Sequence, residues 1–399
     1  MKRRQFIRQL GVPFVVAGLS ETMFPGDAAA APDASGVPSG SAAQTRCLTN
    51  PLQLTPIRAD VNRITGVYTC TRPFRSAGPR IELERFGHKY IVHNYGHGGS
   101  GWSLSWGSGT LALRLAQSTG ARSIAVLGCG ALGLTSALLA QRAGLSVRIY
   151  AKALPPDVPS SNATGLWTPD SRICDAQHAG DVVERWKEMA QISFTTYQKM
   201  LGLPGNPVEW IDNYSLADQP FGSTHFAVDD EPEYANFREA VPELKMPGED
   251  LAPGTHPFQQ SYVRRSPQLM FNLSSYARLL MSDFLANGGK VEVTEFSHAS
   301  QLLKLPEKTI VNATGYGARQ LFGDNTVIPV RGQTARLVPQ PEVRYGLRTR
   351  ELSVVPRSDG VLVQVLGDSG NFNNTDATPN RAQAEQSVRQ LAQLIKGLG

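Results

Sequence analysis

The 399-residue sequence predicts an α/β fold built around a parallel sheet. Three consecutive segments carry this prediction: a short apolar strand over residues 123–127, a helix rich in Ala and Leu over residues 131–142, and a second strand over residues 146–150. Ala143-Gly144 stands where such a helix ends. A strand–helix–strand unit of this kind joins parallel strands through a right-handed crossover.

The start of the chain is predicted to be a twin-arginine export leader over residues 1–31. Arg3-Arg4 precedes an aromatic and an aliphatic residue, a short apolar run and several small residues. The apolar run is far shorter than the ~20 residues that span a bilayer. We therefore expect an exported protein, periplasmic or secreted, without a stable membrane span. Residues 32–50, rich in Ala, Ser, Gly and Pro, are predicted to be a flexible linker.

The composition is that of a globular chain, with 41% hydrophobic and 18% charged residues. The net charge is +5, but the basic residues are scattered and form no run of five, so we expect no nucleic-acid partner. We also expect no metal site, because no metal-ligand spacing occurs among Cys47, Cys70, Cys129 and Cys174. An oxidising compartment would permit a bridge between Cys47 and Cys70.

The remaining segments continue the alternation of helices and strands. The expected elements are a helix over residues 276–286, strands over 290–293 and 309–313, and an amphipathic terminal helix over 382–398. Residues 171–260, which contain many Pro, Asp and Glu, are expected to be less regular. Within them, the acidic run over residues 229–233 is expected to be a solvated loop.

A glycine motif, Gly128-Cys129-Gly130-Ala131-Leu132-Gly133, lies between the first strand and its helix. The first glycine permits a tight turn, the second lets the backbone approach a pyrophosphate, and the third allows close packing of helix on strand. The motif therefore predicts a dinucleotide site. The acid that usually ends the second strand is missing, since Ala151 and Lys152 stand there. Either Asp157 or a backbone group would bind the ribose, or the ribose would be held in a different way.

Further motifs flank this turn on both sides. The sequence contains Thr71-Arg72-Pro73-Phe74-Arg75, His93-Asn94-Tyr95-Gly96-His97-Gly98-Gly99-Ser100-Gly101, Thr164-Gly165-Leu166-Trp167-Thr168-Pro169, Val311-Asn312-Ala313-Thr314-Gly315 and Val330-Arg331-Gly332-Gln333. Together they resemble the D-amino-acid oxidase and D-aspartate oxidase family, whose cofactor is FAD. The nine-residue glycine segment matches the family almost residue for residue.

The order of these motifs differs from the family, where the arginine and glycine segments come last in the chain. The resemblance therefore implies a circular permutation, with old ends joined near residues 107–123 and new ends between the terminal helix and Pro51. It implies a Rossmann-like FAD-binding domain with a parallel sheet, interleaved with a mixed-sheet α+β substrate domain. The FAD-binding domain would comprise residues 76–170 and 261–335, and the substrate domain residues 51–75, 171–260 and 336–399.

The resemblance also implies roles for single residues. Two would be catalytic: Arg72 would clamp the substrate carboxylate, and the carbonyl of Gly99 would accept a hydrogen bond from the substrate amine. The residues expected to bind FAD are Gly98, Gly99, Gly101, Trp102, Gly128, Gly130, Ala131, Leu132, Gly133, Lys152, Ser160, Ser161, Gly165, Leu166 and Trp167. His97 is expected to be structural, because the family transfers a hydride without a side-chain base.

The substrate pocket departs from the family pattern. The family has a tyrosine in a Tyr-aliphatic-aliphatic-Pro run, where this chain has Ser353-Val354-Val355-Pro356, and Thr349 stands four residues earlier. We expect Arg72, Ser353 and Thr349 to line the pocket. Arg348 and Arg350 are expected to face solvent, with an acidic substrate side chain as their alternative partner.

The sequence thus predicts an FAD-dependent enzyme that oxidises an amine next to a carboxylate to an imine, by hydride transfer to the flavin. An amino or imino acid would be the substrate, and oxygen or another acceptor would take the electrons. One alternative is a flavin dehydrogenase or an oxidase of secondary amines or modified peptides. Another, from a different class, is a flavin- or ligand-binding module without turnover.

Overall fold

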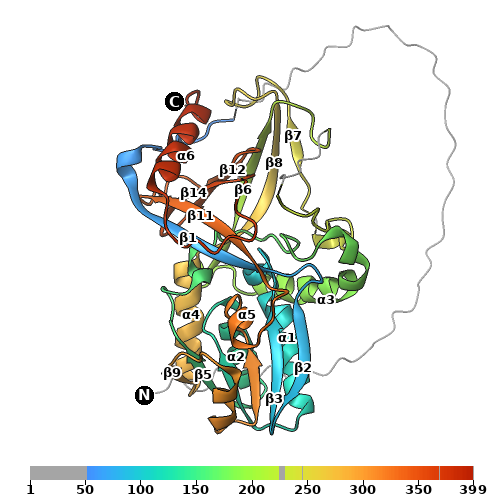
Figure 1. Ribbon diagram of the computed structural model, residues 1–399. Coiled ribbons are helices and arrows are strands. Elements are labelled where there is room, and N and C mark those ends of the chain that lie inside the picture. Colours follow the sequence, from blue (N-terminus) through green and yellow to red (C-terminus); the bar gives the residue numbers. More distant parts are fainter. Residues whose placement is uncertain (1–51, 224–229, 245, 368, 399) are drawn as a thin grey trace, which may run out of the picture. The chain divides into compact units, whose positions relative to one another are not determined.

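The computed structural model describes residues 52–223, 230–244, 246–367 and 369–398, and its strands form two sheets (Figure 1). The leader and linker expected over residues 1–50, including Cys47, lie outside these residues. Within the described part, no helix combines the length and the apolar character that crossing a bilayer requires. The same part of the chain holds no cluster of three or more side chains suited to a metal ion.

The six-stranded sheet is built mainly from parallel strands. Its order is β2 (Arg80–Phe86), β3 (Lys89–Tyr95), β10 (Thr309–Asn312), β4 (Ser123–Leu127), β5 (Ser146–Ala151) and β9 (Lys290–Val293), with β2 antiparallel to β3. Along β4, Ile124 and Val126 pack on one face of the sheet, while Ala125 and Leu127 pack on the other. The helices α1 (Gly101–Ser118), α2 (Ala131–Arg142) and α4 (Leu273–Ala286) cover the first face.

The eight-stranded sheet is mixed. Its order is β1 (Ile64–Phe74), β11 (Ile328–Leu337), β14 (Gly360–Val365), β13 (Leu352–Arg357), β12 (Tyr345–Arg348), β6 (Val208–Ala217), β8 (Tyr262–Phe271) and β7 (Glu249–Leu251). Only the β12–β6 pair in this order is parallel. The terminal helix α6 (Arg381–Leu394) covers one face, where Val388 and Leu391 pack with Leu337 and Val363 (Figure 1). Residues on the opposite face are therefore free to line a cavity.

The predicted fold class is confirmed: a Rossmann-like parallel sheet is interleaved along the chain with a mixed sheet. At two places, however, the expected domain bounds do not coincide with the division of the strands between the two sheets. The segment 261–335, expected to belong wholly to the FAD-binding domain, begins with β8 and ends inside β11, and both strands lie in the eight-stranded sheet. The chain crosses between the sheets inside this segment, because β9 and β10 belong to the six-stranded one.

The local expectations around the glycine motif are confirmed, since β4, α2 and β5 cover nearly the residues expected of them. The expectation that residues 171–260 are less regular was wrong for its first half. This region contains the 20-residue helix α3 (Ala179–Gln198), which buries Val182, Trp186 and Met189 along one face. The many Pro and acidic residues are concentrated in the loops after β6.

Candidate active site

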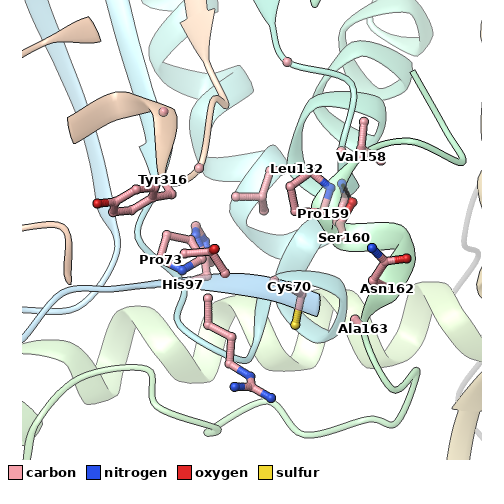
Figure 2. Close-up of a pocket in the computed structure, with 18 of the residues that line it drawn as sticks. Cys70, Pro73, His97, Leu132, Val158, Pro159, Ser160, Asn162, Ala163 and Tyr316 are labelled. Atoms are coloured by element: carbon pink, nitrogen blue, oxygen red, sulfur yellow. Dashed lines mark hydrogen bonds between the residues drawn. The ribbon is translucent and has the colours of Figure 1, made fainter. Parts of the chain in front are cut away.

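One cavity, with a volume of about 1030 Å³, is lined by residues of both sheets. This volume lies at the upper end of the range for small-molecule and cofactor sites. Figure 2 shows Leu132, Pro159, Ser160 and Tyr316 around it, and Cys70 is also a lining residue. The glycine turn, the end of β1 and the loop before α1 therefore meet at a single site, although they are distant in the sequence.

The glycine turn lies at one end of this cavity. Gly128 has a φ of +95°, and a Cβ there would lie 2.6 Å from the carbonyl oxygen of Ala313. A Cβ on Gly133 would lie 2.1 Å from the carbonyl oxygen of Gly128, so this glycine lets α2 pack against β4. Gly130, at the start of α2, lines the cavity. The N–H groups and dipole of the helix therefore favour a negatively charged group at this end.

The glycine-rich loop before α1 forms another part of the wall. Gly98 has a φ of +53°, and a Cβ there would lie 1.8 Å from the carbonyl oxygen of Arg172. The N–H of Gly98 donates to the carbonyl of Pro73 and the N–H of Gly99 to that of Ser171, each at 2.9 Å. These contacts fasten the loop to the end of β1 and to the segment after η2 (Pro159–Asn162). Only glycine allows so close an approach.

Arg72 reaches the cavity from β1. Its Nη1 donates to the carbonyl oxygen of Arg331 on the neighbouring strand at 2.7 Å. The guanidinium lies over Gly332, where a Cβ would be 2.4 Å from Nη2. Burial lowers the pKa of Arg72, and the nearby charge of Arg172 lowers it further. Because Arg72 forms no ion pair within the described residues, its charge is available to an anionic ligand.

Arg172 itself is already paired. Its guanidinium donates to both carboxylate oxygens of Glu231, at 2.9 and 3.0 Å. The Glu231 side chain is only 5% exposed, so the expectation that residues 229–233 form a solvated loop was wrong at this residue. The ring of Tyr234 lies under the same guanidinium, 5.3 Å from it. The pair forms across 59 positions of the sequence, a separation that no local pattern reveals.

The substrate-pocket residues expected from the sequence divide into two groups. Arg72 and Ser353 line the cavity. Thr349 does not, and its expected place in the pocket was wrong. Its hydroxyl accepts hydrogen bonds from the N–H groups of Glu351 and Leu352 in the turn between β12 and β13. Arg348 lines the cavity instead, because successive residues of a strand point to opposite faces.

Most of the residues expected to bind FAD also line the cavity. These are Gly98, Gly99, Gly101, Trp102, Gly128, Gly130, Ala131, Leu132, Lys152, Ser160 and Leu166. Gly133, Ser161, Gly165 and Trp167 do not. Gly165 accepts a backbone hydrogen bond from Phe271 at 2.7 Å, and the ring of Trp167 packs in the core against Phe194 and Tyr197. Gly165 and Trp167 therefore lie behind the cavity wall, in contact with the core.

Acidic residues lie at the end of the cavity where a ribose is expected. Asp157, one of the options left open by the sequence, lines this end. Glu295, which sequence reasoning missed, lines it too, and its carboxylate lies 3.5 Å from the Nζ of Lys152. Glu295 follows β9, the parallel neighbour of β5, so finding it requires the strand order of the sheet.

The side chains of His97 and Cys129, at the same site, are poor bases and poor nucleophiles near pH 7. The Nε2 of His97 lies 2.7 Å from the hydroxyl of Ser108. Burial, together with the charge of Arg185, lowers the pKa of His97 to about 3, so the ring is neutral near pH 7. Burial raises the pKa of the Cys129 thiol to about 12, which removes its nucleophilic thiolate form. Neither group is suited to take a proton from a substrate.

A Rossmann-type glycine turn that opens on a cavity shared with a second, mixed sheet is typical of dinucleotide-binding enzymes. Within this class, the chain belongs to the DAO family of FAD dependent oxidoreductases, whose model matches residues 123–399. The matched region starts at β4. The segments that supply Arg72 and the glycine-rich loop precede it.

Curated relatives agree with this family. The chain is 23% identical over 282 residues to a D-amino-acid oxidase of Dictyostelium discoideum, covering 68% of this chain and 72% of that protein. It is 25% identical over 296 residues to a D-amino acid oxidase of Dugesia ryukyuensis, covering 69% and 78%. Among solved structures, glycine oxidase from Geobacillus kaustophilus has a TM-score of 0.48 at 14% identity, covering 69% of this chain and 78% of that one.

The residues of the cavity fit the FAD that this family binds. The turn at Gly128 and Gly130 has no side chain that would fill the space before α2, where a pyrophosphate would be held. Asp157 or Glu295 would hold the ribose. At the other end, Gly101 lines the cavity, and a Cβ there would meet no atom within 4 Å, so the flavin ring would have room above the loop.

Proposed function

We propose that this chain oxidises an amine next to a carboxylate to an imine, with the hydrogen on the α-carbon leaving as a hydride to the flavin. The amine nitrogen gives up a proton in the same conversion, and addition of water to the imine would release ammonia and a 2-oxo acid. FAD, when bound, supplies the electron acceptor that the side chains of a protein lack. One observation carries the proposal: Arg72, Gly99 and the glycine turn line a single cavity.

Arg72 would bind and orient the substrate. Its guanidinium presents two parallel donors to a carboxylate, and this fork fixes direction as well as position. The carbonyl of Gly99 would accept a hydrogen bond from the substrate amine. The low pKa of His97 and the high pKa of the Cys129 thiol make both groups poor bases near pH 7, which supports removal of hydrogen as a hydride from a neutral amine.

The clamp is tested by Arg72→Met, which keeps the length of the side chain and removes its charge. We expect the substrate concentration that gives half the maximal rate of anaerobic flavin bleaching to rise about 100-fold or more, because two charge-assisted hydrogen bonds are lost. The flavin content, read from the visible spectrum, should stay that of the parent protein. Arg389→Met, on the surface of α6, serves as the control. Unchanged kinetics in Arg72→Met would refute the clamp.

The electron acceptor and the location are part of the same proposal. Peroxide formation under air would identify an oxidase, whereas reduction of an artificial dye without peroxide would identify a dehydrogenase. The twin-arginine pair at Arg3-Arg4 supports export of the folded holoprotein. Replacing both arginines by lysine should retain the protein in the cytoplasm of a bacterial host, and unimpaired export of that variant would oppose the proposal.

A further inference from the structure

Cys70 is a free thiol in the wall of the cavity that fits FAD (Figure 2). It lies on β1 two residues before Arg72 and directly opposite Gly332 of β11. Because strand residues alternate between faces, the side chains of Cys70 and Arg72 lie on the same face of the sheet. Cys129 and Cys174 are buried, whereas Cys70 is partly exposed. Among the described cysteines, Cys70 is therefore the most accessible to a ligand.

A positive charge lies beside this thiol. The guanidinium of Arg72 occupies the space over Gly332, which is the cross-strand partner of Cys70. Burial lowers the pKa of Arg72, and Cys70 is the neighbour that acts most strongly in the opposite direction. The thiolate is the nucleophilic form of a cysteine, and cationic side chains are the neighbours that favour it. Cys70 therefore has the neighbour that a nucleophilic sulfur requires.

Thr334, on the same wall, indicates that a ligand reaches this part of the cavity. It lies on β11 two residues after Gly332, so its side chain is on the same face as the Arg72 guanidinium, and it lines the cavity. Thr334 is only 3% exposed, and its hydroxyl has no hydrogen-bond partner among the residues that the structure describes. Most buried hydroxyl groups in proteins are hydrogen-bonded. A bound ligand would provide the partner that the protein does not.

The length of β1 between Cys70 and the glycine-rich loop suits a flavin. The N–H of Gly98 donates to the carbonyl of Pro73, so this end of β1 is in contact with the loop before α1. Cys70 precedes Pro73 by three residues, which is about 10 Å along an extended strand. The three fused rings of a flavin have a comparable length. The start of α1 favours the pyrimidine edge, which becomes negatively charged on reduction, and the methyl-bearing edge would then lie at Cys70.

We propose that Cys70 is bonded covalently to FAD, by a thioether between its sulfur and a methyl carbon on the benzene ring of the flavin. When this bond forms, the thiol loses its proton and the methyl carbon loses one hydrogen. The electron pair of the broken C–H bond and the two protons pass to the flavin, which is thereby reduced. Molecular oxygen then takes two electrons and two protons, becomes hydrogen peroxide, and leaves the attached flavin oxidised.

This attachment goes beyond the oxidation proposed above and does not depend on it. It requires only FAD, the cofactor of the family to which the chain belongs. Cys70 is a modification site in this proposal, whereas Arg72 keeps its role in binding the substrate. The proposed export would separate the protein from the cytoplasmic supply of FAD, and a covalent bond would prevent loss of the cofactor after export.

The first test asks whether the flavin stays with the denatured holoprotein. Precipitation of the purified protein with trichloroacetic acid should leave the flavin in the pellet. The mass of the denatured chain should exceed that of the polypeptide by the mass of FAD less two hydrogen atoms, and peptide mapping should place the flavin on Cys70. Cys70→Ala should release its flavin into the supernatant. Cys174→Ala, at a buried thiol outside the cavity wall, should retain it as the parent does.

The second test follows the electrons that formation of the bond releases. The full chain, produced in a host starved of riboflavin, is mixed with FAD without oxygen and without any amine. In the parent protein the bound flavin should bleach as the thioether forms, and admission of air should restore the colour and release peroxide in an amount equal to the attached flavin. Cys70→Ala should bind FAD without bleaching it. Bleaching of Cys70→Ala to the extent of the parent would show that the electrons have another source and would oppose the proposal.

Attachment of the flavin and oxidation of an amine fail in different ways. Release of all flavin from the acid-treated parent protein overturns the attachment, as does a flavin mapped to another residue or a disulfide between Cys70 and Cys47. None of these results affects the proposed oxidation, because FAD held without a covalent bond also accepts a hydride. Conversely, a flavin that is bonded to Cys70 but bleached by no amine supports the attachment and overturns the oxidation. Mapping of the parent protein decides the matter even if a variant fails to fold.

Discussion

Arg72 occupies its position because Gly332, on the neighbouring strand, has no side chain. Gly332 lies on β11 directly opposite Cys70, two residues before Arg72. The Arg72 guanidinium occupies the space above Gly332, where it also donates to the carbonyl of Arg331. The atoms that a Cβ at position 332 would meet belong to the far end of a long side chain, so the arginine can move aside without disturbing the sheet.

Gly332→Ala should therefore weaken substrate binding and leave the fold intact. We expect the substrate concentration that gives half the maximal rate of anaerobic flavin bleaching to rise roughly 10-fold. The displaced guanidinium of Arg72 would no longer be aligned with both carboxylate oxygens of the substrate. The melting temperature and the flavin content should match the parent protein. Gly180→Ala, on α3 where a Cβ meets no atom within 4 Å, is the control. Equal substrate affinity in Gly332→Ala and the control would show that Arg72 does not need this space.

His97 makes the stability of the protein depend on pH. Its pKa is lowered by burial to about 3 in the folded protein, against about 6.5 in an unfolded chain. Below pH 6.5 the unfolded chain binds a proton that the folded protein excludes until the pH approaches 3. The stabilisation is therefore complete above pH 6.5 and is lost as the pH falls, by at most about 1.4 kcal/mol per pH unit.

Urea unfolding of the parent protein and of His97→Gln, at pH 7.5 and pH 5, measures this contribution. The free energy of unfolding of both proteins will change with pH through other groups, so the comparison uses the difference between them. We expect the advantage of the parent over His97→Gln to be smaller at pH 5 than at pH 7.5. A difference that is independent of pH would mean that His97 titrates equally in the folded and unfolded states.

At the scale of single elements, the close packing of α2 on β4 depends on Gly133. A Cβ there would meet the backbone oxygen of Gly128 at 2.1 Å, and a backbone atom in a tight turn cannot move aside as a flexible side chain can. We expect Gly133→Ala to lower the free energy of unfolding by about 1–3 kcal/mol and to reduce FAD content. Thermal unfolding and flavin absorbance measure both effects.

Gly180→Ala provides the matched control for that substitution. It makes the same change near the start of α3, where there is open space and no positive φ. Alanine should stabilise the protein there by about 0.4–1 kcal/mol, because it restricts the unfolded chain. If Gly133→Ala were as stable as Gly180→Ala, the contact between α2 and the turn would be looser than the structure shows.

Some of these elements follow from local sequence patterns, and others do not. β4, α2 and β5 were predictable, because each is a short-range pattern and the glycines between them have local steric roles. Which of Arg348 and Thr349 faces the cavity was not predictable, since this depends on the register between β12 and β13. A slip of one residue exchanges the two side chains between faces. Glu295 and Glu231 were missed because their partners come from distant strands and loops.

At the scale of the whole molecule, the circular permutation expected from the order of the motifs stays a prediction. Residues 52–118, which precede the region matched by the family, contribute to both sheets: β1 is an edge strand of one, and β2 and β3 belong to the other. The two ends of the described chain lie near each other, since Leu52 and Leu398 pack against the same apolar cluster. A circular permutation that preserves every core contact is therefore sterically possible.

A circular permutation predicts that a chain in which these two parts exchange places also folds. A chain running from residue 121 to 398, through a short flexible linker, and then from 52 to 120 should fold and bind FAD. Opening the chain between Gly120 and Ala121 keeps the Thr119 hydroxyl bonded to Thr309 and leaves the carbonyl of Arg122 bonded to the N–H of Ser146. Joining residues 398 and 52 with a short linker costs little entropy, because Leu398 and Leu52 pack against the same apolar cluster.

Flavin content, melting temperature and substrate-dependent bleaching of the rearranged protein measure the outcome. All three should approach those of the parent, since the cavity residues, including Arg72 and Gly99, would occupy the same places in the sheets and loops. A second chain opened inside β4, between Val126 and Leu127, interrupts a central strand and should bind no FAD. If both rearranged chains failed to bind FAD, contacts made by residues 52–118 would depend on their place in the chain, and permutation would not explain the order of the motifs.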